Sequence, residues 1–244
     1  MNKALRLIKS FLLLLNRKRM GVFNRISELT KFDHDFNVSW SQDGEDLALI
    51  SILREINQGK YIDVGAHHPS RFSVTRHLYQ KGWSGVNVEA NEDLISEFKE
   101  KRPRDTNVAR FVGSPSKKIF HIFSEPALST SSSEIRDLLV EQSRKLIRST
   151  EVEPISLREI YDTYIPDRRL DLLTVDAEGS DMDVLTSLDF PTLERDRWPR
   201  YVMVETAPPV ENALNFDSVI FLKSLGYTPL VVLTMATVLA APKK

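Results

Sequence analysis

Short apolar segments that end in acidic residues or glycine alternate with helix-forming segments over most of the chain. The apolar segments cover residues 60–66, 85–90, 107–113, 171–176 and 200–205, and the helical ones cover residues 45–56, 73–81, 92–101, 156–164, 180–188 and 216–225. This alternation is typical of a parallel sheet with helices on both faces. Two final apolar segments, 227–232 and 236–241, have no helix between them and indicate an antiparallel end. We therefore predict an α/β fold with a mostly parallel, seven-stranded sheet.

The length fits one α/β domain, which we place at residues 38–244 of the 244-residue chain. Within it, residues 124–149 are expected to form an insertion or lid, because a polar loop at 128–133 precedes a charged helical stretch at 134–148. The loop is interpreted in two ways, as a lid over the acceptor or as an ordinary solvated loop. A shorter strand is expected at residues 118–123.

Composition excludes several kinds of protein. The chain has no cysteine, which rules out a disulfide framework, a thiolate zinc site and a cysteine nucleophile. Its absence suits the reducing cytoplasm, where we place the protein. The net charge of −1 gives no basic field that would attract nucleic acid.

Residues 1–37 are expected to form a basic amphipathic helix followed by a linker. Placed on a helix, residues 1–20 gather leucine, isoleucine and phenylalanine on one side and most of their lysine and arginine on the other. Such a helix can lie at a membrane surface, which predicts peripheral membrane contact. The alternative is packing on its own domain or on a partner in a homo-oligomer.

Polar residues follow the predicted strands, at the edge where ligands bind in open α/β sheets. The cofactor-side candidates are Asp63, Gly65, Ala66, Glu89, Ala90 and Ser114, and the other strand-end residues are His67, His68, Asp176, Glu178 and Glu205. Glu89 ends the second strand more than twenty residues after a glycine turn, where an acidic residue can accept hydrogen bonds from ribose hydroxyls. Asp63 is placed to meet an ammonium group.

The first turn argues against a dinucleotide ligand. A pyrophosphate site needs a run of glycines that lets backbone amides approach phosphate, and here only Gly65 is present. A ribose acceptor without a phosphate cradle suits a nucleoside such as S-adenosylmethionine. The structural alternative is that Gly65 only turns the chain and Glu89 only caps a helix.

Four segments in this order resemble the FkbM-type methyltransferase family. They are Ser41-Gln42-Asp43-Gly44-Glu45-Asp46, Tyr61-Ile62-Asp63-Val64-Gly65-Ala66, Gly82-Trp83-Ser84-Gly85-Val86-Asn87-Val88-Glu89 and Asp176-Ala177-Glu178-Gly179. The resemblance implies a Rossmann-like class I methyltransferase fold, S-adenosylmethionine as methyl donor, and O-methylation of a sugar, glycan, lipid-linked sugar or secondary metabolite.

The resemblance also implies roles by position. Asp63, Gly65 and Glu89 would bind the cofactor, while Gln42 and Glu45 would close over it. Asp176 and Glu178 would face the reacting centre. The first loop, His67-His68-Pro69, departs from the glycine-rich versions of this loop in the family.

Transfer of a methyl group to an alkyl hydroxyl is helped by a general base. The catalytic candidates are Asp176, Glu178 and His67, and we favour the two acids because neighbouring carboxylates raise each other's pKa. The same pair could hold Mg²⁺, which the lack of a further acidic cluster disfavours, so no metal site is predicted. The competing functions are a non-catalytic nucleoside-binding or scaffold protein and a nicotinamide-dependent oxidoreductase.

Overall fold

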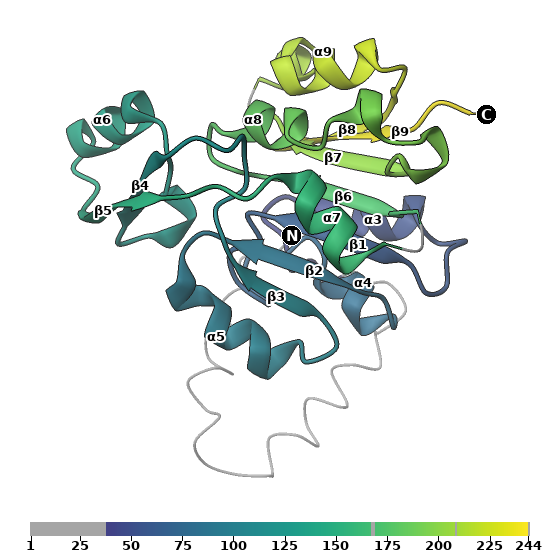
Figure 1. The fold of residues 1–244 in the computed structure, drawn as a ribbon, viewed down its shortest axis with the longest axis horizontal. Coiled ribbons are helices and arrows are strands. Elements are labelled where there is room, and N and C mark those ends of the chain that lie inside the picture. Colours follow the sequence, from purple (N-terminus) through teal and green to yellow (C-terminus); the bar gives the residue numbers. More distant parts are fainter. Residues whose placement is uncertain (1–37, 167–168, 208, 244) are drawn as a thin grey trace, which may run out of the picture. The chain divides into compact units, whose positions relative to one another are not determined.

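The computed structural model describes residues 38–166, 169–207 and 209–243, and its main feature is a seven-stranded sheet (Figure 1). The strands are β1 (Lys60–Val64), β2 (Ser84–Glu89), β3 (Thr106–Ala109), β6 (Leu172–Val175), β7 (Tyr201–Glu205), β8 (Thr228–Val232) and β9 (Ala236–Ala240). Their order is β3-β2-β1-β6-β7-β9-β8. The first five of these are parallel, while β9 runs antiparallel to β7 and β8 antiparallel to β9. The predicted sheet with an antiparallel end is confirmed, and this strand order is that of a class I methyltransferase.

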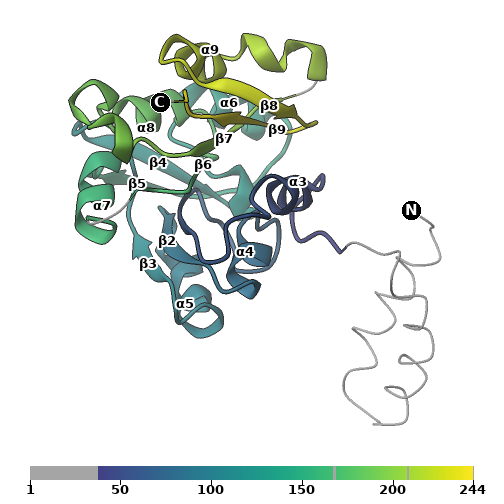
Figure 2. The same ribbon diagram turned by 90° about the vertical axis from the view of Figure 1, so that its right-hand side faces the viewer.

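Helices cover both faces of the sheet (Figure 2). They are α3 (Glu45–Ile52), α4 (Arg76–Gln80), α5 (Glu92–Lys101), α7 (Leu157–Tyr164), α8 (Asp181–Thr186) and α9 (Asp217–Ser224), with short 3₁₀ turns η3 (Phe190–Thr192), η4 (Arg195–Arg197) and η5 (Val210–Asn215). Apolar side chains of α3 and α4 pack on one face of the central strands, and those of α7, α8 and α9 pack on the other. The middle strands are buried on both sides, which explains their continuous apolar sequences.

Side-chain alternation along β1 decides where its residues point. Tyr61 packs with the α3 and α4 side, and Ile62 and Val64 pack with the α7, α8 and α9 side. Asp63 therefore lies on the same side as Tyr61, toward the loop that precedes α4. Its two carboxylate oxygens accept hydrogen bonds from Thr75 Oγ1 at 2.6 Å and Thr174 Oγ1 at 2.7 Å.

A segment of residues 118–152, which we call the arm, leaves the sheet between β3 and α7 (Figure 1). It contains β4 (Lys118–Phe123), the 3₁₀ turn η2 (Pro126–Leu128), α6 (Ser133–Glu141) and β5 (Leu146–Val152). The strands β4 and β5 pair antiparallel in a sheet of their own. The prediction of a helix through residue 148 is wrong, because Ser143 takes a φ of 61° just after α6 and the chain then extends.

Three other predicted boundaries change. The third strand ends at Ala109 rather than at residue 113, so Ser114 does not follow a strand end. The helix expected at residues 73–81 begins only at Arg76, and the helix expected at 45–56 ends at Ile52. The predictions for residues 1–37 lie outside the described residues. Among the residues that the structure does describe, no helix is long and apolar enough to cross a membrane.

Candidate active site

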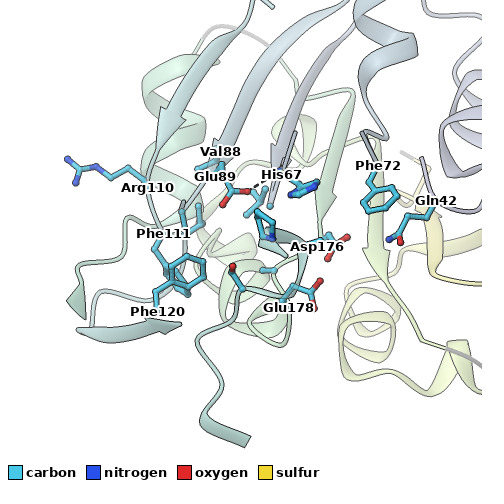
Figure 3. Close-up of a pocket in the computed structure, with 18 residues that line it drawn as sticks. Gln42, His67, Phe72, Val88, Glu89, Arg110, Phe111, Phe120, Asp176 and Glu178 are labelled. Carbon is cyan, nitrogen blue, oxygen red and sulfur yellow. Dashed lines mark hydrogen bonds between the residues drawn. The ribbon is translucent and has the colours of Figure 1, made fainter. Parts of the chain in front are cut away.

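A cavity lies at the carboxyl ends of β1, β2 and β6, the edge of the sheet where ligands were expected (Figure 3). The predicted site residues that line it are Gln42, Gly65, His67, Glu89, Ala90, Asp176 and Glu178. The arm closes it with Phe120, Pro126, Ala127 and Ser129. The structure thus brings together residues separated by more than 130 positions in the sequence.

The turn at Gly65 joins β1 to the turn that follows β6. Gly65 has a φ of 76°, and a Cβ atom built on it would lie 1.7 Å from the carbonyl oxygen of Asp176. The amide of Asp176 donates to the carbonyl of Val64 at 3.1 Å. Only glycine fits so close an approach at this backbone conformation, and the contact fixes Asp176 at the cavity wall.

Glu89 brings a buried carboxylate to the middle of the cavity, between the phenylalanine pair and Asp176 (Figure 3). It accepts hydrogen bonds from the amide of His67 at 3.0 Å and the amide of Asn91 at 2.7 Å. Burial raises the pKa of Glu89 to about 7, against the opposing effect of these amides. Each carboxylate oxygen has a second lone pair, so two acceptor positions remain for a ligand.

An aromatic wall stands next to Glu89. Phe111 and Phe120 pack edge to face with their ring centroids 5.7 Å apart, and both line the cavity. Phe111 follows β3 and Phe120 belongs to the arm, so the wall depends on how the arm docks. An apolar aromatic surface beside a carboxylate suits a base and its ribose.

Carboxyl groups crowd the other side of the cavity. Glu178 has its pKa raised to about 8 by burial and then by the charges of Asp176 and Asp181. Glu205, at the end of β7, also has its pKa raised to about 8, by burial and then by Glu178 and Asp181. Asp176 is exposed at the cavity wall, and desolvation by the surrounding protein, followed by the charge of Glu205, raises its pKa above the usual range. A carboxyl group with a pKa near 8 is matched to proton transfer close to neutral pH.

His67 is a weaker base in this setting. Burial, and then the positive charge of Arg71, lower its pKa to about 4. The ring stacks on Phe72 with centroids 5.9 Å apart, and the backbone has a φ of 51°. A histidine with so low a pKa is neutral at pH 7 and has little affinity for a proton, so the geometry favours the carboxyl groups as the base.

Four predicted site residues are not in the cavity lining. Asp63 is held by Thr75 and Thr174 on the other side of β1, and Ala66 is buried with Ile95 and Phe98. Ser114 donates to Asp183 at 2.6 Å, and Glu45 is buried, where it accepts from the amide of Asp43 at 3.0 Å. Among the described residues, no group of three or more histidine, cysteine and acidic residues could hold a metal ion. The roles of these four residues in cofactor binding remain predictions.

The arm supplies residues that the sequence analysis missed. Thr130 is fully buried and donates from Oγ1 to the carbonyl of Glu178 at 2.6 Å. The hydroxyl groups of Ser131 and Ser180 form a hydrogen bond of 2.7 Å, and Ser180 follows the turn that contains Glu178. The interpretation of this polar run as a solvated loop is therefore wrong. The run of small hydroxyl residues was visible in the sequence, but its partner lies almost 50 residues away.

An ion pair joins the arm to the loop after β1. Arg71 makes two hydrogen bonds to Glu125, at 2.8 Å and 2.9 Å, and both neighbours of this pair, Phe72 and Pro126, line the cavity. The cavity holds about 100 Å³ in this form, less than the roughly 300–1,000 Å³ of ordinary ligand pockets. We therefore expect that the loop and the arm separate when a nucleoside enters.

We predict that Glu125→Gln accelerates both entry and release of S-adenosylhomocysteine. The pair is half exposed, so its loss removes up to about 1 kcal/mol, or about five-fold in the opening equilibrium. Glutamine keeps the acceptor that caps η2. Stopped-flow fluorescence would measure both rates, and Lys117→Gln, which removes another exposed ion pair of the arm, is the matched control. Unchanged rates in Glu125→Gln would show that the ion pair between Arg71 and Glu125 does not hold the loop and the arm together.

The carboxyl cluster also predicts how stability depends on pH. Glu178 and Glu205 have higher pKa values in the folded chain than in the unfolded one, so the folded state holds their protons more tightly. Their contribution is complete below about pH 4.5 and is lost as pH rises through about 8.

The ligand-free protein should therefore lose about 2 kcal/mol for each of the two groups between about pH 6.5 and about pH 9, or about 4–8 °C in Tm for each. Calorimetric melting of the wild type and of a Glu178→Gln/Glu205→Gln variant would test this. The variant should lose clearly less stability than the wild type over this range, and Glu89 and Asp176, whose pKa values are also raised, account for the dependence that remains. A wild type that is equally stable at both pH values would show that the two groups titrate normally.

Comparison with known proteins identifies a methyltransferase family. A family model described as a methyltransferase FkbM domain matches residues 63–229. No curated protein matches the chain. Similar solved structures include the methyltransferase domain of a bacterial Hen1, with 13% identity over 81% of this chain and 98% of that one and a TM-score of 0.42. Another is a TehB-like SAM-dependent methyltransferase from Corynebacterium glutamicum, with 10% identity over 90% and 97% and a TM-score of 0.41.

Proposed function

The chain belongs to the FkbM methyltransferase family, and from this premise we propose that it methylates a hydroxyl oxygen of a sugar, a glycan, a lipid-linked sugar or a secondary metabolite. The family uses S-adenosylmethionine as methyl donor. One observation carries the proposal. A buried carboxylate beside an aromatic wall and a cluster of carboxyl groups with raised pKa values line the same cavity.

The residues of the cavity fit this donor. Glu89 offers acceptors for the ribose hydroxyls, and Phe111 with Phe120 offers an apolar surface for the adenine. Gly65 permits the close backbone contact that places Asp176 at the cavity wall. When bound, S-adenosylmethionine supplies an electrophilic methyl group on a sulfonium that is a good leaving group.

The side chains near the carboxyl cluster would act on the acceptor. Glu178 or Asp176 accepts the hydroxyl proton as the oxygen gains its methyl group, and the second carboxyl group keeps the first one basic. This side of the cavity must also hold the acceptor oxygen within about 3–3.5 Å of the methyl carbon, because alignment of the two atoms strongly lowers the barrier to methyl transfer. Thr130 supports this geometry by holding the backbone of Glu178.

The charge of the cluster favours a neutral acceptor. Among the residues that the structure describes, no lysine or arginine lines the cavity near Glu178 and Asp176, and Arg110 lies on the far side, beyond Phe111 (Figure 3). A carboxylate or phosphate acceptor would be repelled there by like charge. A hydroxyl group has no such penalty and gains a base.

Methyl-transfer assays with isotope-labelled S-adenosylmethionine would test the proposal. Panels of neutral sugars, nucleotide sugars and hydroxylated secondary metabolites would be compared with matched carboxylic acids and amines. We expect labelled methyl ethers from a hydroxyl acceptor, identified by mass spectrometry. Labelling of the acids or amines alone would overturn the assignment of a hydroxyl group as the acceptor.

The sequence of residues 1–20 supports a further proposal, that the protein works in the cytoplasm and contacts membranes peripherally. Membrane contact would bring a lipid-linked acceptor within reach. Co-sedimentation with anionic vesicles should be lost when residues 1–20 are removed. Equal sedimentation of the full chain and the shortened one would contradict membrane contact.

A further inference from the structure

A second hollow lies at the opposite edge of the sheet, where β6 and β7 begin and β9 ends. We call it the basic groove, and the side chains that define it are Arg169, Arg195, Trp198, Arg200, Tyr201 and Lys243. Its volume is about 560 Å³, within the roughly 300–1,000 Å³ that is common for small-molecule sites. Neither the methyl-transfer cavity nor its lining residues extend to it.

Trp198 holds two of the guanidinium groups in place. The guanidinium of Arg195 lies 3.9 Å from the centroid of the Trp198 ring, and one of its nitrogens donates to the carbonyl of Leu225 at 3.4 Å. Arg169 donates from Nε to the carbonyl of Trp198 at 2.6 Å. The indole itself is buried and stacks on Tyr227 with an interplanar angle of 8°. The ring of Trp198 therefore positions Arg195, and the backbone carbonyl of the same residue positions Arg169.

Positive charge in the basic groove is mostly uncompensated. Arg200 lies 3.3 Å from Asp171, which is the one ion pair of the groove within the described part of the chain. Over the same residues, no carboxylate lies within 4.0 Å of a charged nitrogen of Arg169, Arg195 or Lys243. Each guanidinium has five N–H donors, and Arg169 and Arg195 each use one of them on a backbone carbonyl.

We propose that the basic groove binds a phosphate-bearing ligand, either a soluble phosphate ester or diphosphate or the phosphate of a lipid headgroup. Guanidinium forks match the geometry of phosphate oxygens and bind them by charge-assisted hydrogen bonds. A volume of about 560 Å³ accepts more than one phosphate group, so a diphosphate should bind more tightly than a single phosphate.

The basic groove should bind independently of the methyl donor. Tyr201 begins β7 at the groove and Glu205 ends the same strand beside the carboxyl cluster. Four residue steps of about 3.3 Å place the two ends about 13 Å apart, with the buried sheet between them. A ligand in the groove therefore leaves the cofactor residues untouched.

Calorimetric titration of the full chain with inorganic phosphate and with pyrophosphate would test the proposal. The variant is Arg195→Ala/Lys243→Ala, because both side chains are exposed and form no ion pair with described residues. The matched control is Arg144→Ala/Lys145→Ala, which removes the same two residue types from an exposed turn of the arm. A parallel experiment measures binding of the same proteins to vesicles of equal parts phosphatidylglycerol and phosphatidylcholine.

We expect pyrophosphate to bind saturably and more tightly than phosphate, with the same affinity when S-adenosylhomocysteine is present. The groove variant should bind it at least about ten-fold more weakly, and the control variant should match the wild type. Pyrophosphate binding with equal vesicle binding by the groove and control variants identifies a soluble phosphate ligand, whereas weaker vesicle binding by the groove variant than by the control variant, both of which keep residues 1–20, identifies a lipid headgroup. The proposal is overturned if neither probe binds, or if the groove and control variants weaken binding equally.

Discussion

Replacing Glu89 by alanine is expected to abolish measurable binding of S-adenosylhomocysteine. The two acceptor positions left on its carboxylate are the ones that we assign to the ribose hydroxyls. Hydrogen bonds to a charged group contribute roughly 1.5–3 kcal/mol each, so losing two lowers the affinity about 10²- to 10⁴-fold. Isothermal titration calorimetry measures this loss directly.

Two further variants separate binding from folding. Glu89→Gln keeps the size of the side chain and one acceptor oxygen, but its NH2 group faces one of the two backbone amides, so it should bind more weakly than the wild type and also lose some stability. Asn91→Ala removes the cap of α5, whose side chain accepts from the amide of Asp93, and should cost about 1 kcal/mol of stability with unchanged affinity. If Glu89→Gln instead loses stability and keeps its affinity, Glu89 is only a helix cap.

The affinity of the wild type should also fall in acid. Because the pKa of Glu89 is raised to about 7, protonation below that pH removes the charge that strengthens the bonds to ribose. Glu89→Gln should lose most of this pH dependence.

Removing the base should slow turnover while leaving the methyl donor bound. Asp176→Asn or Glu178→Gln, whichever removes the base, should lower kcat about 10²- to 10⁴-fold, with the affinity for S-adenosylhomocysteine changed little. The wild-type rate should rise with pH up to about 8, because the base must be ionised and burial raises the pKa of Glu178 to about 8. The variant that lacks the base should lose this rise.

Asp181→Asn is the matched control for this prediction. Its charge raises the pKa of both Glu178 and Glu205, but its side chain does not line the cavity. Removing it should move the rise in rate to lower pH and leave the maximal rate nearly unchanged. A larger loss of cofactor affinity than of turnover in Asp176→Asn and Glu178→Gln would show that these residues bind the donor instead.

The strand pattern predicted the sheet well because the central strands are buried on both faces. Continuous apolar runs such as residues 172–175 have few alternatives to a parallel strand, and the acidic residues that end them share one edge of the sheet. The placement of Glu89 and Asp176 in one cavity follows from this topology. Asp63 differs because strand alternation turns it to the other face, where two threonine hydroxyls bind it.

The arm could not be predicted from local pattern. Residues 134–148 look helical throughout, but the positive φ of Ser143 ends the helix and β5 pairs with a strand that lies more than twenty residues earlier. The contribution of Phe120 to the cavity wall and of Thr130 to the Glu178 turn follows from that docking. Such contacts depend on tertiary packing, which overrides local preference.

A crystal structure with S-adenosylhomocysteine tests the central claim most directly. The account predicts the ribose hydroxyls on the carboxylate of Glu89, the adenine against Phe111 and Phe120, and the sulfur facing Asp176 and Glu178. A nucleoside bound outside this cavity, or a ribose that does not contact Glu89, would contradict it.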